Sequence, residues 1–279
     1  MRSSRLRTLL TWLAAALLLA ATVEAQFRPR RAGPERRGFD RQARIATASD
    51  FDGRFNFCRI VFRNALDGDG GGWSVDFPRA DENLSIRLSE LTKTPVSLDE
   101  RGAPNHLLVR LTDPELLDCP FVMMSEPGGA FLDENEAAGL RAYLLKGGFF
   151  WADDFWGNYA WDHWVAQLRK ALPAGEYPIV DLPPNHPIFN TQFQVDKVPQ
   201  IPSIGFFFGG ATSERGAESA VPHLRGIQDK GGRLMVVMTH NTDFGDSWER
   251  EGDDPTYFLN FGPRGYALGI NVVLYALTH

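Results

Sequence analysis

The chain has 279 residues, of which 43% are hydrophobic and 23% are charged. This composition is typical of a globular protein long enough for one large domain or two small ones. The formal net charge of −6 excludes a general electrostatic attraction to nucleic acids or anionic lipids, so we expect no nucleic-acid partner.

The first 25 residues predict a cleavable signal peptide. Arg2, Arg5 and Arg7 form a positively charged start, residues 8–23 are almost entirely apolar, and Ala25 ends a small-x-small cleavage pattern. This apolar stretch is shorter than the roughly 20 residues that cross a bilayer, although an uncleaved N-terminal anchor is the alternative. No later stretch is apolar enough to span a membrane. The sequence therefore predicts a secreted or periplasmic protein without a transmembrane span after cleavage.

Residues 26–50 form a basic segment, and residues 51–279 are expected to form a single α/β domain. The basic segment carries seven arginines and few large apolar residues. Such a segment cannot bury enough surface to order itself, so we expect a flexible, solvated tail. An arm that touches anionic lipid or polysaccharide is the alternative.

The two cysteines of the chain are Cys58 and Cys119. Export permits a disulfide between them. Each lies in or beside an expected strand, however, where a cysteine is more often a free, buried and small hydrophobic residue. The sequence therefore favours free cysteines and leaves the pairing open.

The first part of the domain predicts a strand followed by a helix. Residues 54–63 are aromatic and β-branched in partial alternation, which indicates a strand. The glycine-rich residues 67–73 lack the sequence pattern of phosphate-binding loops and predict a flexible connection. Asp81 is expected to cap a helix whose leucines repeat with helical spacing, and extended structure follows at residues 95–98.

The middle of the chain predicts a strand–helix–strand unit. Residues 120–125 form a continuous apolar run, as expected for a strand buried on both faces. Asp133 and Glu136 resemble a capping box at the start of a helix that ends at Gly147. Residues 149–152 form the next strand. Such units connect parallel strands by a right-handed crossover.

The last part of the domain continues this alternation. Its segments are a helix over residues 161–172, an apolar run at 204–208, a buried strand at 233–239 and an amphipathic helix at 265–277. Alternating buried strands and helices predict a three-layer α/β fold with a mainly parallel sheet of five or more strands.

Polar residues gather where the expected strands end. Ligands of an open parallel sheet bind beyond the carboxyl ends of its strands. The ligand-binding candidates at these ends and in a nearby loop are Asp153, Asp154, His186, His240, Asn241 and Asp243. Because adjacent carboxylates at a strand end cannot point the same way, one of Asp153 and Asp154 is expected to face the crevice. The other could cap the next helix.

Three roles fit these residues. His240, Asp243 and Asp246 could ligate a divalent metal ion, but they match no recognised spacing such as HExxH, and we assign no metal or other cofactor. A carboxylate–histidine pair would suit general acid–base catalysis. A buried hydrogen-bond network that fixes the loops is the structural alternative. Covalent acyl chemistry is disfavoured, because no serine or cysteine occupies a nucleophile elbow.

The chain resembles the bacterial family called domain of unknown function 4159, from about Phe55 to His279. The segments that carry the resemblance are FNFCRIVFRN, WSVDFPRADENLSIRLSELT, LRAYLLKGGFFWADDFWG, NHPIFN, GRLMVVMTHNTDFGDSWE and YALGINVVLYALTH. The family is similar to class I glutamine amidotransferase-like domains, which have a flavodoxin-like fold, and to trehalose-utilisation-type domains. The resemblance implies that fold. Asp153 and Asp154 occupy the place of the amidotransferases' catalytic cysteine, so it implies no glutaminase activity.

The sequence favours a non-catalytic ligand-binding or assembly module with an unknown ligand in the polar crevice. The trehalose-utilisation-type relatives make a carbohydrate ligand conceivable, with Trp156, Trp161 and Trp248 as stacking surfaces. The alternative is a hydrolase, with or without a metal ion, acting on a small or carbohydrate substrate. In that alternative Asp153 or Asp154 acts as base and His240 as acid or ligand.

Overall fold

The computed structural model describes residues 45–279. The signal peptide expected at residues 1–25, and the basic tail up to residue 44, lie outside the described residues. Ile45 pairs with Leu108 in an edge strand of the sheet, and Ala46 is buried. Ile45 and Ala46 thus pack onto the domain, whereas residues 47–49 are exposed. Among the helices of residues 45–279, none combines the length and the apolar character needed to cross a bilayer.

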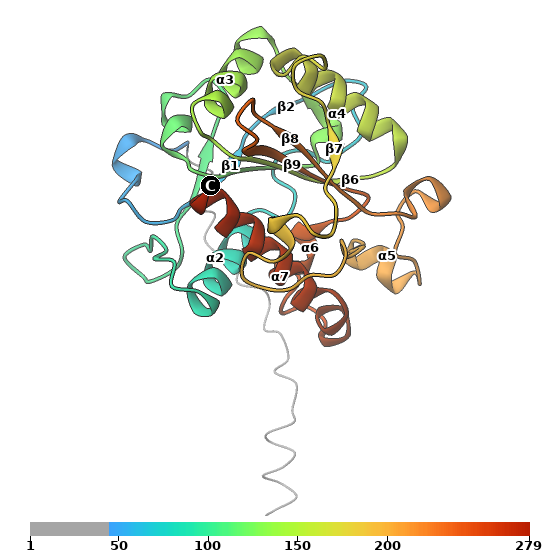
Figure 1. The fold of residues 1–279 in the computed structure, drawn as a ribbon. Coiled ribbons are helices and arrows are strands. Elements are labelled where there is room, and N and C mark those ends of the chain that lie inside the picture. Colours follow the sequence, from blue (N-terminus) through green and yellow to red (C-terminus); the bar gives the residue numbers. More distant parts are fainter. Residues whose placement is uncertain (1–44) are drawn as a thin grey trace, which may run out of the picture. The chain divides into compact units, whose positions relative to one another are not determined.

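A seven-stranded sheet forms the centre of the domain, in the order β3-β1-β4-β6-β9-β8-β7 (Figure 1). Its strands are β1 (Phe57–Ile60), β3 (His106–Val109), β4 (Val122–Ser125), β6 (Phe150–Phe155), β7 (Val180–Asp181), β8 (His223–Gln228) and β9 (Leu234–His240). The first five strands in this order are parallel, and β8 and β7 join them antiparallel. A separate pair is formed by β2 (Arg63–Asn64) and β5 (Ala130–Phe131). The mainly parallel α/β sheet is therefore confirmed.

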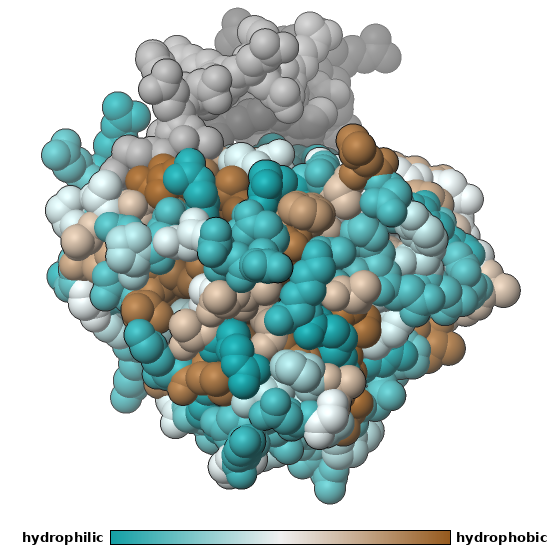
Figure 2. Space-filling view, turned by 90° about the horizontal axis from the view of Figure 1, so that it is seen from above, coloured by the Kyte–Doolittle hydropathy of each residue, from teal (hydrophilic) through white to brown (hydrophobic). Residues whose placement is uncertain are grey.

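Helices cover both faces of this sheet (Figure 1). On one face lie α3 (Glu134–Leu145) and α4 (Gly157–Ala171), and on the other lie α2 (Arg79–Leu91), α6 (Phe244–Glu249) and α7 (Pro255–Thr278). The short helices are α5 (Ile204–Phe208), η1 (Ala48–Asp50), η2 (Pro114–Asp118), η3 (Pro127–Gly129), η4 (Pro187–Phe189) and η5 (Gly216–Ser219). On the face drawn in Figure 2, hydrophobic residues lie between hydrophilic ones.

Alternate residues of the parallel strands supply two hydrophobic cores. In β4, Val122 and Met124 join the core that includes α3 and α4, whereas Met123 joins the core of α2 and α7. Successive side chains of a strand point to opposite faces. A strand covered by helices on both sides must therefore be apolar throughout, which explains the continuous run at residues 120–125.

The first turns of α3 and α2 test the two helix caps that the sequence predicted. The capping box of α3 is confirmed: the Asp133 carboxylate accepts from the amides of Asn135 and Glu136, and the Glu136 carboxylate accepts from the Asp133 amide. The expectation that Asp81 caps a helix is wrong. It lies inside the first turn of α2, fully buried, where its carboxylate binds the Arg59 guanidinium.

Cys58 and Cys119 form a disulfide, so the expectation of free cysteines is wrong. Cys58 lies in β1, and Cys119 follows η2 just before β4. Both are buried in the core beneath α3 and α4. The bond closes a loop with a sequence separation of 61 residues and ties β1 to the segment that enters β4.

Candidate functional site

A cavity of about 500 Å³ opens at the carboxyl ends of the parallel strands. The chain places β3 on one side of β1 and then β4, β6 and β9 on the other side. Such a reversal leaves a crevice in which open α/β sheets bind ligands. The lining residues are Asp69, Gly70, Val75, Asp76, Glu126, Asp154, Phe155, Trp156, Ser203, Ile204, Gly205, Glu214, Arg215, Asp243, Asp246, Glu249 and Arg250. Eight of them are acidic and two are basic, so the cavity is strongly acidic.

A β-bulge in β6 separates the roles of Asp153 and Asp154. Ala152 pairs with Met238 and Phe155 pairs with His240, so one extra residue of β6 is inserted opposite β9. Asp154 adopts a left-handed backbone with φ 59° and lines the cavity. A bulge re-aims the side chain that follows it. The bulge thereby directs the Asp154 side chain into the cavity and the Asp153 side chain away from it. Both residues belong to β6, which ends at Phe155.

Asp153 lies behind the cavity and is completely buried. Its Oδ2 accepts hydrogen bonds from the amides of Phe244 (2.9 Å) and Gly245 (3.1 Å), and its Oδ1 accepts one from the Thr239 hydroxyl. Asp153 thus binds the amides that begin α6, rather than those of the next helix, α4. Burial raises the pKa of Asp153 to about 7.

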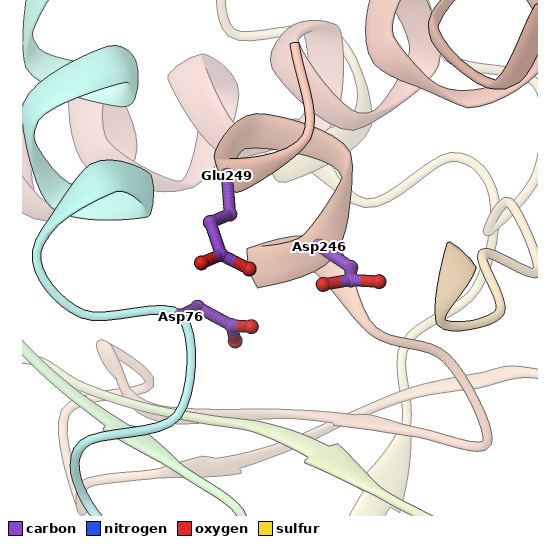
Figure 3. Close-up of side chains that lie close together, drawn as sticks. All are labelled: Asp76, Asp246 and Glu249. Atoms are coloured by element: carbon purple, nitrogen blue, oxygen red, sulfur yellow. The ribbon is translucent and has the colours of Figure 1, made fainter. Parts of the chain in front are cut away.

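Two groups of carboxylates meet in the cavity, and Asp76 belongs to both. Asp76, Asp154 and Asp243 offer oxygen atoms within 4.8 Å of one another, and so do Asp76, Asp246 and Glu249. Figure 3 shows the second group: Asp76 approaches from the loop before α2, while Asp246 and Glu249 project from α6 into the same space. Clustered carboxylate oxygens are the ligands that Ca²⁺ and Mg²⁺ take in proteins.

Burial raises the pKa values of these carboxyl groups. The pKa of Asp76 lies well above its usual range because of burial and the nearby Asp246. Burial also raises the pKa of Asp154, with Glu126 adding to the effect, and the pKa of Asp243, with Asp154 adding to it. Desolvation and like charges both disfavour the ionised forms. The cluster therefore favours either bound protons or a compensating cation.

Arg59 supports the loop that carries Asp76. It is completely buried, and its Nε lies 3.1 and 3.0 Å from the two carboxylate oxygens of Asp81. Its Nη1 donates to the carbonyl oxygens of Trp73 (3.3 Å) and Val75 (3.0 Å), just before Asp76. The sequence predicted that the glycine-rich residues 67–73 form a flexible loop. The buried Arg59 instead fixes the end of this loop through two backbone carbonyl groups.

The glycine-rich loop also packs on the turn after β4. The Asp69 amide donates to the Gly128 carbonyl oxygen (2.9 Å), and the Gly72 amide donates to the Glu126 carboxylate (2.8 Å). A Cβ atom on Gly68 would lie 2.8 Å from the Gly129 backbone, so this close approach requires glycine. The loop brings Asp69 to the cavity. Its Gly72 amide is already bound to the Glu126 carboxylate.

Four non-glycine residues at or near the cavity have a left-handed backbone. They are Asp76 (φ 64°), Glu126 (φ 48°), Asp154 (φ 59°) and Asn241 (φ 62°), and residues 45–279 contain no other non-glycine residue with positive φ. Three of them line the cavity, and the Asn241 side chain accepts from the Gly157 amide (2.9 Å). Such conformations cost about 1 kcal/mol or more each and concentrate at functional sites.

His240 lies near the cavity but does not line it. Its Nδ1 is 3.1 Å from Nη1 of Arg225, which can only donate, so Nδ1 accepts. The proton therefore sits on Nε2, which donates to the Gly157 carbonyl oxygen at 3.0 Å. Burial lowers the pKa of His240 to about 4. Both ring nitrogens are occupied, so acting as acid or metal ligand would require breaking these bonds.

His186 lies apart from the other candidates. Its ring packs against Tyr275 near the end of α7, with 5.7 Å between the ring centroids. The cavity lies near the start of that helix, where the Tyr257 hydroxyl binds the carbonyl of Pro202. The 18 residue-to-residue steps from Tyr257 to Tyr275 span about 27 Å of helix. The structure therefore does not bring His186 to the proposed crevice.

The tryptophans offer little stacking surface. Trp248 is completely buried, which excludes it as an exposed platform. The ring of Trp161 is covered by the Arg225 guanidinium, 4.1 Å from the ring centroid. Trp156 lines the cavity, and its Nε1 donates to the Asp154 carboxylate (3.0 Å).

Two acidic residues of the cavity had no strand-end signal in the sequence. Asp76 follows the glycine-rich loop, and Glu214 lies between α5 and η5. Neither follows a strand, so the rule that identified Asp154 and Asp243 could not find them. The one sequence feature that could have pointed to Asp76 is its position just after the glycine-rich loop.

The chain was also compared with known proteins. Residues 60–277 match the family described as Domain of unknown function (DUF4159). No curated protein matches the chain. Because the match covers most of the chain, this protein belongs to the DUF4159 family.

Proposed function

We propose that this protein is an exported, non-catalytic ligand-binding module whose acidic cavity takes up a divalent cation. The observation that carries the proposal is the pair of carboxylate groups that share Asp76. Ca²⁺ takes roughly six to eight oxygen ligands, whereas structural Zn²⁺ sites rely on cysteine and histidine. A bound cation would also offset the mutual repulsion of Asp76, Asp154 and Asp243.

The cavity has room for more than an ion. Its volume of about 500 Å³ falls within the range of small-molecule sites. We propose that an oxygen-rich ligand, such as a carbohydrate, completes the coordination of the cation. The carboxylates would then act mainly through the cation, and Phe155 and Trp156 would be the aromatic residues that face the ligand.

The proposed fold type is flavodoxin-like, as in class I glutamine amidotransferase-like domains. Numbered along the chain, the five parallel strands follow the order 2-1-3-4-5 that characterises flavodoxin-like sheets. The bulge at Asp153 and Asp154 would correspond to the position of the amidotransferase nucleophile. We therefore propose a shared architecture with a different chemistry.

We also propose a secreted or periplasmic location. The buried disulfide supports it, because such bonds persist in oxidising compartments. N-terminal sequencing of the protein from its natural host should find Gln26 as the first residue. An intact Met1 in a cytoplasmic fraction would contradict export.

A metal-assisted hydrolase is the second candidate. Two carboxylate groups with one shared member are the arrangement that can hold two neighbouring cations, which activate water and stabilise a leaving oxygen. In this candidate Asp154 acts as base, and the chemistry does not depend on His240.

The experiment is calorimetry and thermal melting of the mature protein with Ca²⁺, Mg²⁺ or Mn²⁺ after treatment with EDTA. A cation at about 100 times its Kd adds about 2.7 kcal/mol to stability. In a domain of this size we expect the melting temperature to rise by roughly 5 to 10 °C. Asp154→Asn and Asp243→Asn should remove most of the shift. Asp162→Asn, an exposed aspartate of α4, is the matched control and should retain it.

Superimposable melts with and without each cation would refute the proposal. Turnover distinguishes the two candidates. The cation-loaded protein is incubated with nitrophenyl esters, phosphates and glycosides. Cation-dependent hydrolysis that disappears in Asp154→Asn would favour the hydrolase, and cation binding without turnover on these substrates would favour the binding module.

A further inference from the structure

Residues 203–218 border the cavity between two fixed points. At one end, Ile201 is completely buried, and the Pro202 carbonyl oxygen accepts from the Tyr257 hydroxyl (2.7 Å). At the other end, Ser219 is completely buried, and its carbonyl oxygen accepts from Gln200 (2.7 Å). Between these ends, five residues of the segment line the cavity. Movement of the segment would therefore change access to the cavity without displacing its ends.

The segment itself buries little surface. None of residues 203–218 is buried, and Phe208 is 66% exposed. Two of its apolar residues, Ile204 and Phe207, pack partly buried against the core, and the Phe207 ring centroid lies 5.6 Å from that of Tyr257 and 5.5 Å from that of Phe261. Segments with few buried apolar contacts open at low free-energy cost. The segment has the local character expected of a movable element.

An ion pair ties the segment to the opposite wall of the cavity. Nη2 of Arg215 lies 2.8 and 3.1 Å from the two carboxylate oxygens of Asp69, and both residues line the cavity. Asp69 belongs to the glycine-rich loop, which is anchored to Gly128 and Glu126. The pair therefore links a weakly packed segment to a fixed one.

Two glycines allow this segment to bend. Gly210 has φ 80° and Gly216 has φ 63°, and a Cβ atom at either would contact nothing within 4 Å. Positive φ is readily available to glycine but strained for most other residues. Gly216 directly follows Arg215, so the backbone can bend beside the ion pair.

We infer that residues 203–218 form a lid, and that the pair of Arg215 and Asp69 is its latch. Breaking the latch frees the part of the lid around Arg215. The buried ends at Ile201 and Ser219 stay in place, and so does the hydrogen bond from the Ile204 amide to the Asp246 carboxylate (2.8 Å). The lid sets the rate at which a solute enters the cavity. The inference that the lid controls cation entry rests on the proposed function. The inference that the lid moves does not.

Hydrogen exchange measured by mass spectrometry tests the motion. Arg215→Gln and Asp69→Asn should each speed exchange in residues 204–218 by roughly two- to fivefold, the range expected for an exposed ion pair. Exchange in α3 and α4 should not change. Lys230→Gln, which breaks the exposed pair with Glu176 (3.7 Å), is the matched control and should leave exchange in the lid as in the natural protein.

Stopped-flow binding of Tb³⁺ tests control over entry, with luminescence excited through Trp156. The two latch variants change the charge of the cavity in opposite directions. A two- to fivefold faster association in both variants therefore reports the latch rather than charge. Faster association in Arg215→Gln but slower association in Asp69→Asn would overturn control over entry.

Unchanged exchange in both variants would overturn the lid, whether or not Tb³⁺ binds. Faster exchange without any Tb³⁺ luminescence would support the lid and refute the cation proposal. The two proposals thus fail independently.

Discussion

Replacing Arg59 by methionine tests whether a buried cation supports the cavity. Arg59 and Asp81 are both completely buried, so Arg59→Met leaves the Asp81 carboxylate without its counter-ion in the core. The carbonyl oxygens of Trp73 and Val75 lose their donor at the same time. Methionine keeps the length of the side chain, so the charge and the hydrogen bonds are the main loss.

The expected cost follows from these contacts. Removing one partner of a buried ion pair costs about 3 to 5 kcal/mol. We therefore expect the free energy of unfolding to fall by about 4 kcal/mol. In a domain of this size the melting temperature would drop by roughly 10 °C.

Urea unfolding of a double-mutant cycle provides the measurement. Arg59→Met and Asp81→Leu should each be strongly destabilising. The double variant should recover at least half of the loss, because apolar residues often replace a buried ion pair at little cost. Arg110→Met removes an exposed pair with Asp113 (3.8 Å) and should cost less than about 1 kcal/mol. A cost below 1 kcal/mol for Arg59→Met, or a double variant less stable than both single ones, would refute the reasoning.

Three further predictions concern stability and binding. Replacing both cysteines by alanine should lower the free energy of unfolding by about 4 kcal/mol in urea, since the closed loop spans 61 residues; a loss below 1 kcal/mol would contradict this. The pKa of Asp153 rises on folding from 3.8 to about 7, so the native state holds a proton that the unfolded chain releases, and this group's contribution to stability falls as pH rises from about 4 to 7. Asp153→Asn removes that contribution, and the slope of the unfolding free energy against pH should become less negative by up to about 1.4 kcal/mol per pH unit; an unchanged slope would exclude the raised pKa. Gly245→Ala places a Cβ atom in steric conflict with Oδ2 of Asp76 and should weaken Ca²⁺ binding in calorimetry roughly tenfold, about 1.4 kcal/mol. The control Gly175→Ala, whose Cβ would meet nothing within 4 Å, should leave the affinity for Ca²⁺ unchanged. Equal affinities in the two variants would argue against Asp76 as a ligand.

The features that could be predicted depend on residues close together in the chain or on one geometric rule. The capping box of Asp133 and Glu136 is local, and so is the apolar run of β4. The rule that parallel strands end at the same edge of a sheet placed Asp154 and Asp243 in one crevice, and the structure brings them together. These inferences needed no knowledge of side-chain partners.

The remaining features depend on partners that are distant in sequence. Asp81 is a plausible cap until the buried Arg59, 22 residues away, claims its carboxylate. His240 follows a strand as predicted, but Arg225 and Gly157 bind both of its ring nitrogens. The bulge in β6 depends on the register with β9 and leaves no mark in the sequence beyond two consecutive aspartates. Pairing and register of this kind are set by packing.

The left-handed backbone at Asp76, Glu126, Asp154 and Asn241 restricts how this cavity can change in evolution. A β-branched residue at any of these positions meets a steric penalty whatever the ligand is. Glycine relieves the backbone but deletes the polar group. Aspartate and asparagine tolerate this conformation and keep a polar side chain. Divergence at Asp76 and Asp154, which line the cavity, should therefore proceed by exchanging aspartate for asparagine, so that related proteins can retune the charge of the cavity in single steps while the backbone around it stays the same.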